Sequence, residues 1–166
     1  MRTKTLEGWL RGIRLSHIAQ SRAASRNLRM HRVLGIPVVI LTTFVGTAVF
    51  ASVGKTPQHP AVPIVTGVLS VLAAILSSLQ TFLGHSSNAE RHKSAAVKYG
   101  MLRRELEQFL EDSDESSQIL KEFMENFRAR WDQVDQESLV VSEKIHDEAV
   151  RILERNLAEE KLREAQ

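Results

Sequence analysis

The sequence VLGIPVVILTTFVGTAVFASVG, residues 33–54, holds no charged side chain over 22 consecutive positions. A second uncharged stretch of 33 positions covers residues 57–89. About 20 helical residues, rising about 1.5 Å each, cross a hydrocarbon core of roughly 30 Å, so both stretches are long enough to span a bilayer. A core helix of a small soluble protein is rarely apolar on every face. The pattern predicts transmembrane helices at residues 33–54 and 62–84, joined by an extracytoplasmic turn at residues 55–61.

Basic residues flank these two stretches and predict their orientation. Residues 1–32 carry eight Lys/Arg and one Glu, and residues 84–104 carry five Lys/Arg and one Glu. The connection between the stretches has only Lys55. Positively charged flanks stay in the cytoplasm, so we expect both termini on the cytoplasmic side. A cleaved signal peptide fits poorly, because 32 residues precede the first stretch and a second one follows it.

The first 32 residues predict a basic amphipathic helix. At 100° per residue, six arginines fall within an arc of about 120°. One interpretation of this arginine stripe is attachment to anionic lipid headgroups. The other is capture of ligand phosphates by guanidinium groups. Both remain open for Arg11, Arg14, Arg22, Arg26, Arg29 and Arg32.

Residues 85–166 predict a cytoplasmic helical region that is acidic in its second part, with 18 acidic and eight basic residues at positions 105–166. The helix of the second span is expected to continue into this region, and residues 112–114 suit a turn. Residues 139–141 suit either a short extended segment or a helix. Ser142 suits the N-cap of a last helix. Two packing seams with spacings of three and four can hold a ring together or fold back within one subunit. They comprise Ala95, Tyr99, Leu102, Leu106 and Phe109, and Leu120, Met124, Phe127, Trp131 and Val134.

No catalytic constellation emerges from the residue patterns. The chain has no cysteine, no glycine-rich phosphate loop after a strand and no paired-histidine protease motif. His85 and His92 are seven residues apart, and interfacial polar roles suit them better than metal ligation. We therefore expect no enzyme, no cofactor and no metal site.

Small and hydroxylated residues inside the spans are the candidate functional positions. In the second span, Thr66, Ser70, Ser77 and Thr81 lie within about 60° of one another, which suits either a water-filled path or interhelical hydrogen bonds. In the first span, Gly35, Thr42 and Gly46 share one face and favour close helix packing. Two helices about 8–10 Å apart leave no lumen between them. A pore would therefore need a homo-oligomer of at least four copies.

The expected fold class is an all-α membrane protein. It comprises a two-helix transmembrane hairpin, an N-terminal amphipathic helix and a cytoplasmic helical domain, in an oligomeric ring. The layout resembles the SLATT family of two-transmembrane effectors associated with bacterial nucleotide second messengers. The likeness covers about residues 10–135 and rests on the basic helix before the spans, on residues 78–83 (SLQTFL) and on residues 96–105 (AVKYGMLRRE). Within these motifs Tyr99, Leu102 and Glu105 are the most telling positions.

This resemblance implies an anti-phage effector in the bacterial inner membrane that forms an ion channel or pore. A partner nucleotidyltransferase would make the cyclic nucleotide or short oligonucleotide that governs the gate. Many relatives carry a fused sensor domain, and none is identified here, so either the chain's own helices or a separate protein would sense the ligand. Two alternatives are a non-conducting membrane adaptor that recruits a cytoplasmic partner, and a holin-like lysis protein, which the acidic helical region disfavours.

Overall fold

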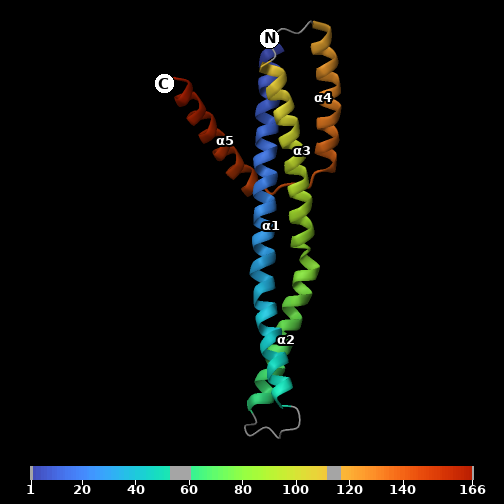
Figure 1. Cartoon of the computed structure of the whole chain (residues 1–166), viewed down its shortest axis with the longest axis vertical. Helices are drawn as coiled ribbons and strands as arrows, with labels where there is room; N and C mark the ends of the chain where they lie inside the picture. Colours follow the sequence, from blue (N-terminus) through green and yellow to red (C-terminus); the bar gives the residue numbers. More distant parts are fainter. Residues whose placement is uncertain (1, 53–60, 112–116, 166) are drawn as a thin grey trace. The chain divides into compact units, whose positions relative to one another are not determined.

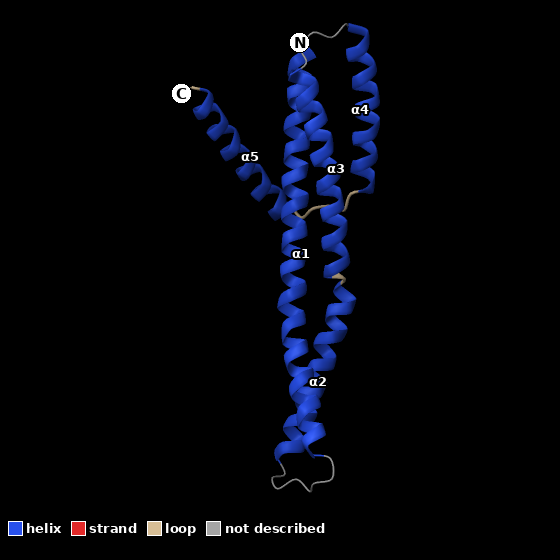
Figure 2. Cartoon of the chain, viewed as in Figure 1, coloured by secondary structure: helices blue, strands red, loops and turns tan. Residues whose placement is uncertain are grey.

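The computed structural model describes residues 2–52, 61–111 and 117–165, and in these ranges all regular structure is helical (Figures 1 and 2). The predicted all-α fold is thereby confirmed. The turn expected at residues 55–61 and the turn expected at residues 112–114 lie outside the described residues, except for position 61. The helices are α1 (Arg2–Ser52), α2 (Ala61–Leu83), α3 (His85–Glu111), α4 (Ser117–Glu137) and α5 (Glu143–Glu164).

The chain divides into two compact units. Residues 1–25 and 89–166 form one unit, which we call the helical bundle. Residues 26–88 form the other, which we call the spanning unit. Helix α1 continues from the bundle into the spanning unit, so the predicted amphipathic helix and first span are parts of a single helix. Pro37 consequently lies inside α1.

The core of the helical bundle is built where α1, α3 and α4 meet. Leu6 and Ile13 of α1 pack with the α3 seam and with Phe127 of α4, and Ile13, Leu106 and Phe127 are fully buried. Aromatic rings extend this core, since Trp9 stacks on Phe127 at a centroid distance of 6.1 Å. Both predicted seams are thus confirmed as packing surfaces, and they are filled within the one chain.

Helix α5 follows a short non-helical segment at residues 138–142 and begins after Ser142. Ser142 occupies the N-cap position as predicted, but its side chain makes no capping hydrogen bond. The helix buries Ile145, Ala149 and Leu153 at spacings of four. Beyond Leu157, which is half-buried, the described side chains of α5 are exposed.

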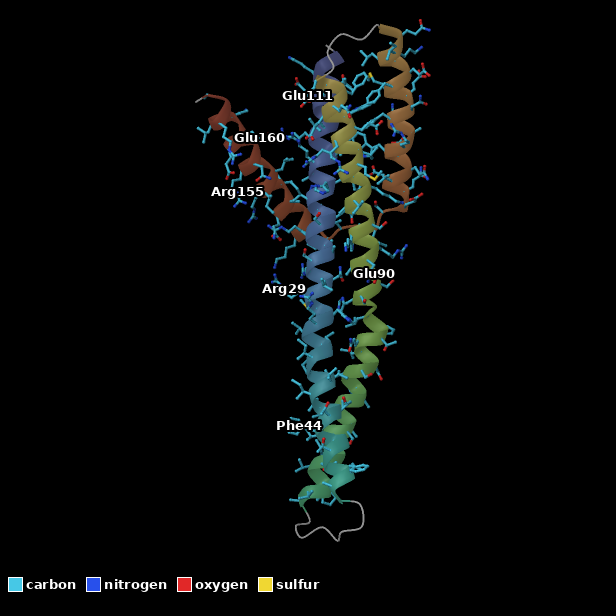
Figure 3. The ribbon with its side chains drawn as sticks, viewed as in Figure 1. Arg29, Phe44, Glu90, Glu111, Arg155 and Glu160 are labelled. Atoms are coloured by element: carbon cyan, nitrogen blue, oxygen red, sulfur yellow. The ribbon has the colours of Figure 1, made fainter. Side chains whose placement is uncertain are left out.

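The spanning unit exposes large apolar side chains on both of its helices. Phe44 of α1 is 68% exposed (Figure 3), and Phe82 of α2 is 89% exposed. None of the most apolar 18-residue window of the first candidate span is buried, and only 6% of that of the second is. A core helix of a soluble protein would be mostly covered, whereas apolar surface of this extent is stable in lipid. Together these observations support a membrane protein with two transmembrane helices.

A single glycine separates the second span from the helix that follows. Gly84 has φ +56° and lies between the end of α2 and the start of α3. The left-handed region favours glycine because a Cβ there approaches the following carbonyl oxygen. The amide of Asn88 donates to the Gly84 carbonyl at 3.0 Å, so helical bonding resumes at once. The helix therefore continues beyond the second span as expected, with a break of one residue at Gly84.

Candidate functional site

The hydroxyl stripe of the second span lies on α2, beside the face that packs within the spanning unit. Thr66 and Ser70 are half-buried, whereas Ser77 and Thr81 are exposed. Ala73, between them along the helix, is buried. The stripe therefore borders the packed face of α2, and its two members nearest Gly84 are exposed.

Most hydroxyl groups of the stripe donate a hydrogen bond to a backbone carbonyl of α2 itself. The hydroxyls of Thr66, Ser70 and Thr81 donate to backbone carbonyls four residues earlier at 2.9, 2.8 and 3.1 Å. Such bonds let a hydroxyl lie in an apolar environment, while its oxygen lone pairs remain available to water or a cation.

The space between residues 44–48 of α1 and residues 61–69 of α2 is apolar. A pocket of about 310 Å³ lies there, lined by side chains such as Phe44, Val65 and Leu69. Thr66 is the one hydroxylated residue of its lining. This pocket offers no polar path through one copy of the chain, which agrees with the expectation that two helices leave no lumen.

The small residues of the first span lie in different surroundings. A Cβ added at Gly35 would lie 3.1 Å from the Gln80 side-chain nitrogen of α2, so Gly35 marks a close approach within the chain. A Cβ added at Gly46 would meet no atom within 4 Å, and Thr42 is exposed. Gly46 and Thr42 thus have open space beside them, and their packing role stays a prediction about another copy.

Two polar contacts connect the helices of the spanning unit near Gly84. Gln80 Nε2 lies 3.4 Å from His31 Nδ1, and His85 Nδ1 lies 3.1 Å from Asn27 Oδ1. The partner of Gln80 lies 49 residues away along the chain, so spacing within one helix does not reveal it. Residues 31 and 27 occupy successive turns of α1, which is why one face of it meets both contacts.

The arginine stripe is partly engaged by carboxylates of the same chain. Arg14 donates through Nε and Nη2 to one oxygen of Glu107 on α3, at 3.1 and 2.8 Å. Its Nη1 donates to Glu160 of α5 at 3.0 Å, and Arg22 pairs with Glu148 of α5 at 3.5 Å. The sequence showed the opposite charges of the two regions but not that they meet.

The remaining arginines of the stripe are exposed, as Figure 3 shows for Arg29. Within the part of the chain that the structure describes, no ion pair involves Arg11, Arg26, Arg29 or Arg32. Burial lowers the pKa of Arg14, but its hydrogen bonds to Glu107 and Glu160 outweigh this effect and leave the pKa raised. Arg14 therefore keeps its charge under all physiological conditions.

A buried polar contact in the bundle was not predicted. Gln20 and His92 are 5% and 6% exposed, and Gln20 Oε1 lies 2.5 Å from His92 Nδ1. Gln20 Nε2 donates to the Leu139 carbonyl at 3.0 Å. His92 and His85 thus have separate polar partners, and among the described residues no three His, Cys, Asp or Glu side chains gather so as to hold a metal ion.

Comparison with protein families gives one match. The model described as "SMODS and SLOG-associating 2TM effector domain family 4" matches residues 11–156. Comparison with curated proteins and with solved structures gives no match. The matched range includes the arginine stripe, both spans and α5 through residue 156.

Proposed function

Because the chain belongs to the SMODS and SLOG-associating two-transmembrane (SLATT) effector domain family, we propose that it is a membrane effector of bacterial anti-phage defence. In this proposal it lies in the bacterial inner membrane with both termini in the cytoplasm. Several copies form an ion channel or pore whose gate responds to a nucleotide-derived signal. The orientation is supported by the basic flanks at residues 1–32 and 84–104.

The observation that carries the channel proposal is the exposed part of the hydroxyl stripe. Ser77 and Thr81 are exposed in a helix whose other exposed side chains are largely apolar. In an assembly, copies of this stripe would line a common axis, where hydroxyl oxygens can contact water and ions. The pocket between the described spanning helices of one chain is apolar, so at least four copies would be needed around such an axis.

The assembly would form through the spanning unit rather than through the cytoplasmic seams. Both seams are already packed inside the bundle, so they offer no free surface to a second copy. The open space beside Gly46 and Thr42 suits contact between neighbouring subunits, because small residues let helices approach closely.

The proposed regulatory ligand is a cyclic or short linear oligonucleotide made by a partner nucleotidyltransferase. Its phosphates suit guanidinium groups, which donate in pairs to phosphate oxygens. The exposed arginines of α1 supply such groups near the start of the first span.

A pair of adjacent serines provides the test of the channel proposal. Ser77 and Ser78 are both exposed, but they point about 100° apart around α2, and only Ser77 belongs to the stripe. We expect Ser77→Leu to lower ion flux through liposomes containing the purified chain at least severalfold, and Ser78→Leu to leave it near wild type. Flux would be recorded with and without cyclic triadenylate. Equal flux in both variants, or no flux from any folded assembly, would refute the lining.

The second candidate function is a non-conducting adaptor. It is favoured by the folded helical bundle, which is larger than a simple pore needs. Expression of the chain alone in bacterial cells separates the two functions, since an unregulated channel lowers the membrane potential and an adaptor does not. A holin-like protein would also lower it, and would in addition release a co-expressed endolysin.

A further inference from the structure

Helix α5 is held to α1 in two different ways along its length. Its first half buries the side chains of Ile145, Ala149 and Leu153 within the helical bundle. Its start is also fixed, because the carbonyl of Leu139, just before the helix, accepts the hydrogen bond from Gln20 of α1. Toward its end the apolar contacts cease, and Leu162 is 66% exposed. There the Glu160 side chain reaches Arg14, with Glu160 labelled on α5 in Figure 3.

Two ion pairs join α5 to α1, Arg14 with Glu160 and Arg22 with Glu148. Other anions can displace the carboxylates of these pairs from the arginines. The side chains of Glu148 and Glu160 are each 52% exposed, and that of Arg22 is 49% exposed. Exposed pairs of this kind are weak and are screened by salt. A ligand that carries several phosphates forms stronger, charge-assisted hydrogen bonds with guanidinium groups than one exposed carboxylate does.

Arg14 is oriented for such an exchange. Glu107 of α3 binds its Nε and Nη2 through one carboxylate oxygen, which fixes the plane of the guanidinium group. The Nη1 position is left for Glu160. Removal of Glu160 would therefore expose an oriented donor, rather than a flexible side chain.

We infer that the part of the arginine stripe formed by Arg11, Arg14 and Arg22 is a phosphate-binding surface. In the free protein Glu148 and Glu160 of α5 occupy this surface. Phosphates of the ligand replace these carboxylates and release the distal part of α5 from α1. The inference deepens the proposed function and rests on it, because it assigns the signal to this face. The acidic helix is then an internal competitor that sets how much ligand is needed.

A matched pair of double variants tests the competition. Glu148→Gln with Glu160→Gln removes the two α5 carboxylates that pair with arginines of α1. Glu154→Gln with Glu159→Gln changes the net charge of α5 equally at exposed positions, of which Glu159 pairs with Arg155 in the same helix. With the full chain in phosphatidylcholine nanodiscs, we expect the first variant to bind inorganic tripolyphosphate about threefold to tenfold more tightly than the control variant. Equal affinities would overturn the inference.

A distance measurement keeps the test valid even if a variant folds poorly. Because the chain has no cysteine, Thr5→Cys in α1 and Asn156→Cys in α5, both at exposed positions, give two unique spin-label sites. Tripolyphosphate should lengthen and broaden the distance distribution between them, and should do so less when Arg14→Gln and Arg22→Gln are also present. A distribution unchanged at saturating tripolyphosphate would overturn the inference.

The source of the phosphate is separated by the lipid composition. Nanodiscs that contain phosphatidylglycerol should release α5 without tripolyphosphate if lipid headgroups occupy the arginine stripe, and should not if a soluble ligand does.

Liposome flux then separates this inference from the proposed function. Release of α5 without ion flux would support the phosphate-binding surface and contradict the channel. Gated ion flux without movement of α5 would support the channel and contradict the phosphate-binding surface.

Discussion

Gln20 connects α1 to α3 and to the segment before α5 through the nitrogen and the oxygen of its side-chain amide. Its Nε2 donates to the Leu139 carbonyl, so its Oε1 must accept from His92 Nδ1. This fixes the proton of His92 on Nδ1, because an unprotonated nitrogen there would face an acceptor. Burial, and secondarily the charge of Arg91, lowers the pKa of His92, so the side chain is neutral at pH 7.

Substitution of Gln20 by methionine should destabilise the bundle. Gln20→Met keeps the approximate size of the side chain but leaves the buried His92 ring and the carbonyl of the half-buried Leu139 without their partner. A buried unsatisfied polar group costs about 1–3 kcal/mol, so we expect a loss of that order in the free energy of unfolding. Circular dichroism in detergent would measure the loss. The control is Gln108→Met at an exposed position of α3, and an equal effect in both variants would contradict the argument.

We expect the helical bundle to lose stability at high pH because Tyr99 is buried in it. The residue is 2% exposed and its hydroxyl donates to Asp135. Burial, and then this bond, raises its pKa to about 12. Tyrosine in the unfolded chain loses its proton near pH 10, whereas Tyr99 in the folded chain keeps it until about pH 12. The contribution of Tyr99 to the free energy of unfolding is therefore complete below pH 10. Between pH 10 and pH 12 it falls by up to about 1.4 kcal/mol per pH unit. Since Tyr99 is the single tyrosine of the sequence, absorbance at 295 nm follows it directly. Tyr99→Phe should remove this part of the pH dependence, and an identical profile would exclude it.

The spanning helices differ in how closely they approach along their length. Gly35 lies against Gln80, while Gly46 has open space within the chain. We expect Gly35→Leu to force α1 and α2 apart and to lower the thermal stability in detergent by several degrees, since overpacking costs about 1–3 kcal/mol. Gly46→Leu should leave the stability of the single chain nearly unchanged. If Gly46→Leu instead lowers only the oligomer fraction, that result would place Gly46 between subunits.

Gly84 interrupts what is otherwise a good helical sequence. Its left-handed φ costs a non-glycine residue about 1–2 kcal/mol, whereas alanine favours a continuous helix. No atom lies within 4 Å of an added Cβ, so the effect of Gly84→Ala comes from the backbone alone. We expect this variant to join α2 and α3 into one helix and to slow hydrogen exchange of the amides around residue 84. Unchanged exchange there would show that the break does not depend on glycine.

Much of the whole molecule was predictable because it follows from periodicity and charge. The spans follow from uncharged stretches, and the seams around Tyr99 and Phe127 follow from spacings of three and four. The break at Gly84 was not predictable, since glycine inside an apolar stretch does not reveal its φ. The partners of Arg14 and Gln20 lie far away in sequence, and spacing within one helix carries no information about them. The candidate site was therefore predictable as two stripes, but not as the contacts between α1 and α5.

The two units of the chain have separate physical tasks in this account. The spanning unit exposes apolar side chains to lipid and brings hydroxyls to its surface, and the helical bundle buries its own seams and holds carboxylates against arginines. A signal that binds the bundle must alter contacts among spanning units if it is to open a path. Under the proposed function that step takes place in an assembly, because the pocket between the described spanning helices of one chain is apolar.

The mass of the membrane-embedded particle shows whether the chain acts as an oligomeric pore. Native mass spectrometry of the full chain released from lipid nanodiscs would count its copies of 18.7 kDa. The account predicts a closed assembly of four or more copies in the preparation that conducts ions. A conducting preparation that contains only monomers or dimers would contradict it.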